Sequence, residues 1–314
     1  MEVGPFGMLQ TVADLLKLFH KEHILPASSF PFLFRLAPLV LFATVFAALS
    51  VLPVGPAWSG AGLDSALFFL MAVLTLEIAG VLMAGYASGN KYSTLGAMRA
   101  VAQLVSYEVP LGLSVLTVVL FSGTLDLGKI AMSQSTESSG FFLGISGLAH
   151  AGGFTAWNIF LMPVLMPVFI IFFICSLAES NRAPFDLPEA ESELVAGFHT
   201  EYGGFPWAVI MLAEYGMMLL TCLLGSILFL GAWNTPFADV GTFHLGEWTT
   251  GPGWGIFWLF SKAVFLVLVQ IWVRWTYPRI RLNQLLAVSW KYLTPASIVL
   301  MIVTGTWKLL LAEQ

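Results

Sequence analysis

The sequence predicts an all-α protein that crosses a membrane several times, a polytopic transmembrane helix bundle. Of its 314 residues, 58% are hydrophobic and 10% are charged, and the mean hydropathy is +0.86. Soluble domains carry about a quarter of their residues as charged side chains. The apolar residues also form long stretches, whereas a β-barrel would show short segments of alternating polarity. Composition and patterning together indicate an integral membrane protein.

Seven stretches reach the roughly 20 residues that a helix needs to cross the hydrocarbon core of a bilayer. They are Leu36–Val54, Ser65–Gly85, Ala102–Ser122, Trp157–Ala178, Trp207–Gly231, Gly255–Trp275 and Thr294–Leu311. Prolines inside these spans, at Pro110, Pro163 and Pro167, are tolerated where neighbouring helices satisfy the freed backbone groups. Residues 1–314 are expected to form one integral membrane domain.

An amphipathic helix is expected before the first span, over residues 7–21. Its apolar side chains are Met8, Val12, Leu15, Leu16 and Phe19, and its polar side chains are Gln10, Asp14, Lys17 and Lys21. Such a helix lies in the membrane interface with its apolar face toward the lipid. A cleaved signal peptide is disfavoured because this segment lacks a basic start, a short apolar centre and a small-residue cleavage site.

The distribution of Lys and Arg predicts the orientation, because cytoplasmic loops are richer in these residues. One side collects Lys17, Lys21, Arg35, Lys91, Arg99, Arg182, Arg274, Arg279, Arg281 and Lys291. The other side collects only Lys129 and Lys308. The N-terminal segment and the loop 179–205 are therefore expected in the cytoplasm, with the C-terminus outside.

The loop 179–205 concentrates acidic residues between two apolar spans. It holds Glu179, Asp186, Glu189, Glu191, Glu193 and Glu201, with Arg182 as its one Lys or Arg. Uncompensated charge beside the membrane is costly and usually functional. This acidic loop is therefore the first candidate for the functional site.

A short helix is expected inside the acidic loop, beginning at Asp186 and ending near Gly197. Asp186 stands at an N-cap position, Pro188 in the first turn, and Glu189 where a capping box places an acid. Capping explains Asp186 and Glu189 without any further role. It does not explain Glu193, which lies four residues from Glu189 on the same helical face with no cation to pair. Packed carboxylates beside water share protons, as a proton-handling site requires.

Further ionisable residues lie within the spans and must face the bundle interior, a partner or a water-filled cavity. Glu108, Glu214 and Lys262 are candidates for a polar path through the membrane, with Glu77 a weaker one. Glu108 is expected near the cytoplasmic end of its span. A static buried pair of Glu214 and Lys262 is the alternative to a role in proton transfer.

Other motifs carry less weight. Cys175 and Cys222 are the only cysteines, so this chain does not hold an iron–sulfur cluster through four Cys ligands. Gly123–Ile130 has the spacing of a phosphate-binding loop, but Ile130 stands in the place of the metal-binding Ser or Thr. His20 and His23 lack a third ligand, so no metal site is expected.

Several motifs resemble one family over nearly the whole chain, the quinone-site membrane subunit of respiratory complex I, which is subunit 1 of the mitochondrial complex. The acidic run Ala178–Tyr202 carries the strongest resemblance. The other matching segments are Val3–Gly7, Ala84–Tyr92, Leu95–Gln103, Ser106–Glu108, Tyr277–Arg281 and Gln284–Leu285. Related membrane-bound hydrogenase subunits share the fold, but the ending Gly197–Tyr202 favours the quinone-reducing branch. Family members also begin with one more transmembrane helix, so the sequence is expected to be N-terminally incomplete or to have a misassigned start.

The resemblance implies a subunit without redox chemistry in the bacterial inner membrane, part of a proton-translocating NADH:quinone oxidoreductase. The protein would form the membrane end of the quinone chamber and link quinone reduction to proton translocation. No residue would be catalytic and no cofactor would bind to the chain, because flavin and iron–sulfur clusters belong to partner subunits. Partners would be the peripheral quinone-site subunits and the antiporter-like membrane subunits, with quinone and lipid as ligands and no nucleic acid.

The acidic-loop residues would tune protonation near the quinone headgroup, with Arg99, Arg182, Arg274 and Arg279 as counter-charges. Three other interpretations stay open: a hydrogenase-type anchor subunit, a stand-alone cation/proton antiporter and a purely structural anchor. Co-purification with flavin, iron–sulfur and antiporter-like subunits would distinguish the complex from a chain that exchanges cations alone.

Overall fold

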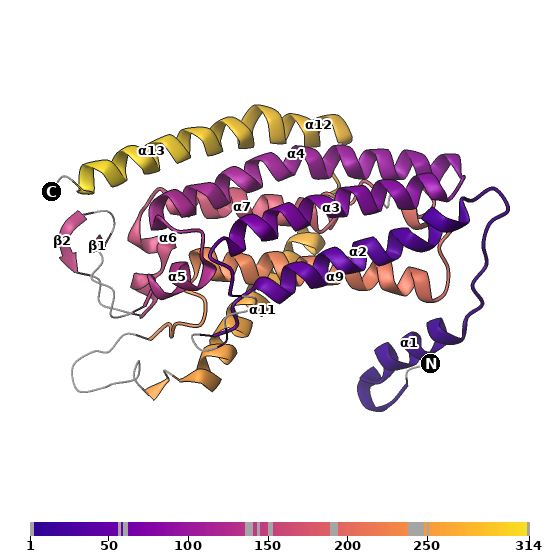
Figure 1. Cartoon of the computed structure of the whole chain (residues 1–314), viewed down its shortest axis with the longest axis horizontal. Helices are drawn as coiled ribbons and strands as arrows, with labels where there is room; N and C mark the ends of the chain where they lie inside the picture. The colour runs from indigo at the N-terminus through magenta and orange to yellow at the C-terminus, as the bar shows by residue number, and fades with distance from the viewer. Residues whose placement is uncertain are drawn as a thin grey trace.

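The computed structural model describes residues 3–55, 58, 62–135, 141–142, 145–149, 153–188, 194–237, 248–249 and 251–312. Most of its long helices run side by side along the longest axis of the molecule (Figure 1). The long helices are α2 (Pro31–Val51), α3 (Ala66–Ala87), α4 (Lys91–Ser122), α7 (Leu165–Glu179), α9 (Phe205–Phe229), α11 (Pro252–Thr276) and α13 (Thr294–Ala312). Helix α11 is inclined to the others (Figure 1). The prediction of a polytopic helical bundle is confirmed.

Shorter elements connect these helices. They are η1 (Pro5–Gly7), α1 (Gln10–His20), α5 (Leu127–Met132), η2 (Gly153–Ala156), α6 (Asn158–Leu161), η3 (Gly197–His199), α12 (Leu282–Ala287) and η4 (Val288–Leu293). Two strands, β1 (Phe141–Phe142) and β2 (Ile145–Ala149), pair antiparallel. This hairpin is a local addition to a helical protein.

Six helical segments in the described part of the chain are long and apolar enough to cross a membrane. The expected span Trp157–Ala178 differs, because it is divided into α6 and the 15-residue α7. Pro163 lies in the break and cannot donate a hydrogen bond to the carbonyl of Ile159. The expectation of one continuous helix here is therefore wrong, although α6 and α7 together still connect the two ends of the bundle.

Helix α4 begins earlier than expected. Its first residue is Lys91 rather than Ala102, and the Asn90 side chain caps it by accepting a hydrogen bond from the N–H of Tyr92 at 3.0 Å. Glu108 consequently lies 17 residues into the helix, about 26 Å from its start at 1.5 Å per residue. Glu108 therefore lies near the middle of a 32-residue helix; its depth in the membrane stays a prediction.

The connecting segments gather at two ends of the bundle. One end, called the acidic-loop end, is formed by residues 21–30, 88–90, 180–188, 194–204 and 277–281. At this end a Cβ on Gly204 would lie 3.2 Å from the Lys21 carbonyl, and the Ile280 N–H donates to the Pro184 carbonyl at 3.2 Å. At the opposite end, Phe154 N–H donates to the Pro236 carbonyl at 3.0 Å. The structure thus groups the loops as the orientation prediction requires; which end faces the cytoplasm stays a prediction.

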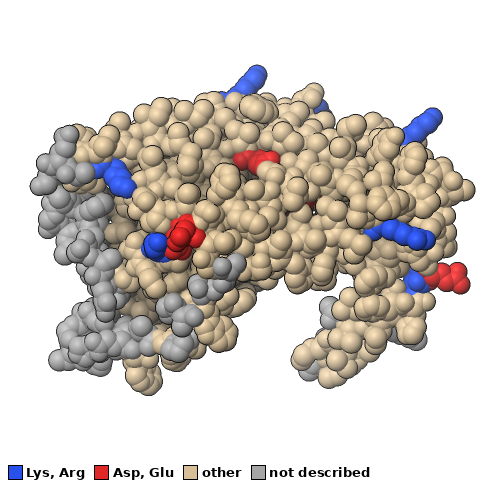
Figure 2. Space-filling model, viewed as in Figure 1, with Lys and Arg blue, Asp and Glu red and all other residues tan. Residues whose placement is uncertain are grey.

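The bundle has a buried core and a largely apolar exterior. Phe34, Leu70, Tyr107 and Phe172 are among the largest fully buried side chains, and they come from α2, α3, α4 and α7. Most of the visible surface carries neither acid nor base (Figure 2). Helix α1 lies at the edge of the bundle beside the N-terminus (Figure 1), where Phe19 stacks on Phe205 of α9 with ring centroids 5.0 Å apart. Its apolar residues Val12, Leu15, Leu16 and Phe19 are exposed.

Candidate functional site

The candidate site begins where α7 ends and the acidic loop starts. Gln103 is fully buried on α4. Its Nε2 donates to the Ala178 carbonyl at 2.8 Å and to Asn181 Oδ1 at 3.2 Å. Asn181 has a φ of 48°, a left-handed conformation that Asn adopts more readily than most residues. These contacts fix the point at which the chain leaves the helix.

Glu179, the last residue of α7, belongs to a buried cluster of carboxylates. Its side chain interacts electrostatically with Glu77 of α3 and Glu108 of α4. Glu77 and Glu179 are buried, at 8% and 4% exposure, and Glu108 is half-buried. Three helices therefore bring three acids together inside the bundle. Coupled acids of this kind titrate as a group, not one at a time.

Asp186 lies among arginines in the loop that follows α7. Arg279 Nη2 donates to Asp186 Oδ2 at 3.0 Å, and Arg274 and Arg182 also act electrostatically on this carboxylate. Burial raises the pKa of Asp186, while the hydrogen bond and charge of Arg279 oppose that rise. The structure thus brings together four of the predicted site residues.

Arg182 connects this arginine cluster to α9. Its Nη2 lies 3.3 Å from Glu214 Oε1, and the side chains are 11% and 9% exposed. The guanidinium also lies over the Tyr215 ring, 4.3 Å from its centroid. A buried ion pair is strongly destabilised when one partner is lost, so Arg182 and Glu214 depend on each other.

The last part of the acidic loop packs against α2 and the start of α4. Glu201 Oε1 accepts a 2.6 Å hydrogen bond from Asn90 Nδ2, and the Tyr202 ring stacks on Phe34 with centroids 4.1 Å apart. Burial raises the pKa of the Tyr202 hydroxyl. Burial also lowers the pKa of His199 to about 4, so this imidazole is neutral at pH 7.

The backbone of η3 packs very closely against the first turns of α4. Ser93 Oγ donates to the Phe198 carbonyl at 2.9 Å. A Cβ on Gly96 would lie 2.8 Å from the backbone of Gly197, so only glycine allows this approach. Gly197 itself has a φ of 62°.

Glu189, Glu191 and Glu193 fall outside the described residues, and so do the capping contacts of the expected helix after Asp186. Arg99 is half-buried on α4. Lys262 does not pair with Glu214; its Nζ donates to the carbonyls of Ala232 and Asn234 at 2.9 and 2.7 Å, at the opposite end.

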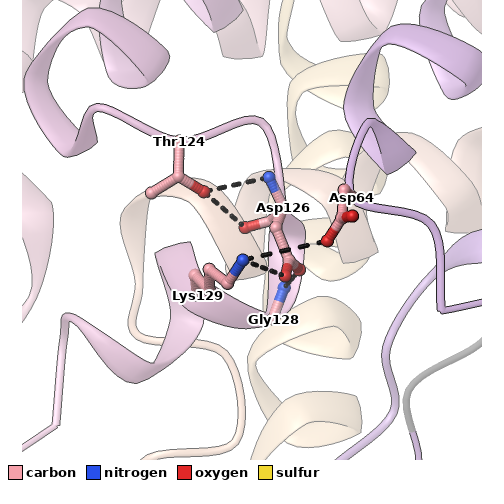
Figure 3. Close-up of polar contacts among 5 residues, drawn as sticks. All are labelled: Asp64, Thr124, Asp126, Gly128 and Lys129. Atoms are coloured by element: carbon pink, nitrogen blue, oxygen red, sulfur yellow. Dashed lines mark hydrogen bonds and ion pairs between the residues drawn. The ribbon is translucent and has the colours of Figure 1, made fainter.

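The segment with phosphate-loop spacing has a structural explanation at that opposite end. Asp126 caps α5 by accepting from the Gly128 N–H at 2.8 Å. Lys129 lies 3.5 Å from Asp126 and 3.9 Å from Asp64 (Figure 3). The lysine is therefore used in surface ion pairs, in agreement with the low weight of this motif in the sequence.

Sequence reasoning undervalued Glu77 and missed Gln103 and Asn90. Glu77 could have been found, because an ionisable residue inside an apolar span is a candidate functional residue. Gln103 is a polar amide on the buried side of a span, and Asn90 precedes a helix as N-caps do. None of these signals identifies the partner across the bundle.

The chain is similar to known proteins over almost its whole length. A family model described as NADH dehydrogenase matches residues 1–305. The chain is 49% identical to a second H-type subunit of the NADH-quinone oxidoreductase of Cytophaga hutchinsonii, over 98% of this chain and 89% of that protein. It is 48% identical to the H-type subunit of the NADH-quinone oxidoreductase of Chlorobium luteolum, covering 98% and 79%. The corresponding subunit of Polaromonas naphthalenivorans is 42% identical, covering 97% and 80%.

Proposed function

Because the chain belongs to the NADH dehydrogenase family, we propose that it forms the membrane end of the quinone chamber in an NADH:quinone oxidoreductase. It is a multi-pass membrane subunit of that complex. Its task is to pass the effect of quinone reduction to proton translocation through buried carboxylates. Flavin and iron–sulfur clusters reside in partner subunits, and quinone is the substrate.

The observation that supports this proposal is the position of Glu179. On one side, Glu179 interacts with Glu77 and Glu108 inside the bundle. On the other side, the chain continues directly into the loop that Arg182 and Arg279 hold. A change in the loop therefore acts on the buried carboxylates through a few covalent bonds.

The acidic loop would respond to quinone through its charges. Asp186 is balanced by arginines, and Arg182 is balanced by Glu214. When a quinone headgroup accepts two electrons, it gains proton affinity and shifts the charge balance near such groups. The loop would then reorder, and a change in the backbone at Asn181, where the chain leaves α7, would alter the electrostatic field at the Glu179 carboxylate.

The Lys and Arg pattern supports a cytoplasmic acidic-loop end. Partners would then approach from two directions: peripheral quinone-site subunits over the acidic loop, and antiporter-like subunits along the membrane. The exposed apolar face of α1 would lie in the interface beside the acidic-loop end.

Glu179→Gln in the assembled complex tests the proposal. Glutamine keeps the shape and hydrogen bonding of the side chain but cannot carry a proton, so quinone reduction and proton pumping should both fall by roughly tenfold or more. The control is Asp64→Asn, an exposed carboxylate at the opposite end, which should leave both rates unchanged. A Glu179→Gln complex that assembles and pumps at the wild-type rate would refute the role of this cluster.

A purification experiment distinguishes the complex from the other classes. The detergent-solubilised chain should co-purify with flavin, iron–sulfur and antiporter-like subunits and reduce quinone with NADH. Co-purification with a hydrogenase would show the hydrogenase-type anchor instead. A chain that runs alone and exchanges cations in liposomes would show an antiporter, and one that runs alone without exchange would show a structural anchor.

A further inference from the structure

A proline in α4 leaves one backbone carbonyl without its helical partner. Pro110 lies inside α4, and proline has no N–H to donate to the carbonyl four residues earlier. That carbonyl belongs to Ser106. Inside a bilayer no water replaces the missing donor, so another protein group must supply it.

The missing donor comes from the C-terminal helix. Ser289 Oγ donates to the Ser106 carbonyl at 2.5 Å, and Trp290 Nε1 donates to Ser106 Oγ at 3.2 Å. Ser289 is fully buried. One turn earlier, the Tyr107 hydroxyl of α4 donates to the Leu285 carbonyl at 3.1 Å. These bonds join the two helices where they run side by side (Figure 1).

A second proline explains why the helix is irregular at this place. Ser289 and Trp290 lie in η4, a π-helical turn between α12 and α13, in which the Thr294 N–H donates to the Ser289 carbonyl. Pro295 follows directly. It cannot donate to the Lys291 carbonyl, and its ring would clash with that carbonyl in α geometry. The wider π turn accommodates the proline, and π turns are frequent at functional sites.

We propose that Ser289 is a positioning residue for Glu108. Its hydroxyl replaces the donor that Pro110 lacks and so fixes the backbone of α4 at Ser106, two residues before Glu108. The position of the Glu108 carboxylate relative to Glu179 depends on that stretch of backbone. The functional part of this inference rests on the proposed role of the carboxylate cluster, whereas the hydrogen-bonded joint does not.

Ser289→Ala in the assembled complex is the first test, with rates expressed per amount of complex. The rate of quinone reduction should fall about tenfold, the size expected for one buried acceptor left unsatisfied, and fewer protons should be moved per NADH oxidised. The control is Ser297→Ala, a buried serine in α13 whose hydroxyl donates to the Thr294 carbonyl of its own helix. It should retain the wild-type rate and stoichiometry.

Two further variants test the hydrogen bond itself. Ser289→Thr retains a hydroxyl and Ser289→Val has the same shape without one, so the threonine variant should work several-fold faster than the valine variant. Pro110→Ala restores the helical N–H to the Ser106 carbonyl. Ser289→Ala should therefore cost much less in a Pro110→Ala background than alone.

Three results would overturn the inference: Ser289→Ala behaving like Ser297→Ala, equal rates for the threonine and valine variants, or an undiminished effect of Ser289→Ala beside Pro110→Ala. If Pro110→Ala does not assemble, the threonine and valine pair decides. Glu108→Gln identifies a failure of the proposed function. If Glu108→Gln pumps normally, the Ser289 and Pro110 variants are compared instead by the temperature at which the complex dissociates. Non-additive effects of Ser289→Ala and Pro110→Ala on that temperature would show that the hydrogen bond joins the two helices but does not position a functional carboxylate.

Discussion

Replacing Glu214 by Gln should break the buried ion pair that joins Arg182 to α9. The substitution keeps the volume of the side chain but leaves the Arg182 guanidinium without its carboxylate at 3.3 Å. Breaking a buried ion pair by removing one partner costs about 3–5 kcal/mol. The Tyr215 ring still faces the cation at 4.3 Å, so the lower value of about 3 kcal/mol is expected.

A cost of about 3 kcal/mol corresponds to more than a 100-fold shift in a population. Quinone reduction and proton pumping by Glu214→Gln should therefore fall severely in inverted membrane vesicles. Hydrogen exchange in the segment 180–186 should become faster in the same complex. Both effects follow from losing the ion pair that holds Arg182 against α9.

The matched control removes both charges at once. Arg182→Gln together with Glu214→Gln leaves no uncompensated charge, so the double variant should assemble and exchange more like wild type than either single variant. Two observations would refute the reasoning. One is a Glu214→Gln complex that pumps at the wild-type rate at neutral pH and one unit to either side. The other is a double variant whose defects are the sum of the single defects.

Three other predictions follow from the geometry. Arg279→Ala should impair assembly or quinone reduction more than Lys308→Ala. Arg279 balances the partly buried carboxylate of Asp186, whereas Lys308 donates to the Leu120 carbonyl at an exposed helix end. Equal losses of activity in membranes would contradict this prediction. Gly96→Ala should reduce the yield of assembled complex, whereas Gly112→Ala on the same helix, where a Cβ meets its nearest neighbour only at 3.8 Å, should not; similar yields would count against the close docking of η3. Because the pKa of His199 is lowered to about 4, unfolded chain binds a proton below about pH 6.5 that the folded segment does not. Stability of η3 should therefore be lost as the pH falls from about 6.5 toward 4, and His199→Gln should remove that dependence in hydrogen exchange.

The membrane-spanning helices could be predicted because a long apolar stretch has a favourable transfer free energy wherever it lies in the fold. The boundaries could not be predicted so well. Lys91–Val101 contains charged and polar residues, so hydropathy placed the start of the span at Ala102, although the helix already begins at Lys91. The break before α7 depends on Pro163, which other helices could have accommodated.

The candidate site was predictable only in part. The acidic loop and its arginine partners are concentrated in short segments, and Asp186 does meet Arg279. The partners of Glu179 lie on α3 and α4, and no spacing along the chain shows that these helices place Glu77 and Glu108 beside it. The same limit explains why Glu214 was considered with Lys262, although Arg182 is its partner.

The C-terminal helix α13 has little of its surface covered by the rest of the chain. Within the apolar window of Leu282–Leu311, 22% of the residues are buried inside the molecule, compared with 61% for α9. Lipid tails are as apolar as leucine, so no hydrophobic force presses such a helix against its neighbours in a bilayer. In a bilayer its place depends on its packing and its few polar bonds with α4, and on the lipids or partner subunits that would cover its other sides. Detergent that replaces this cover should release α13 before any other long helix.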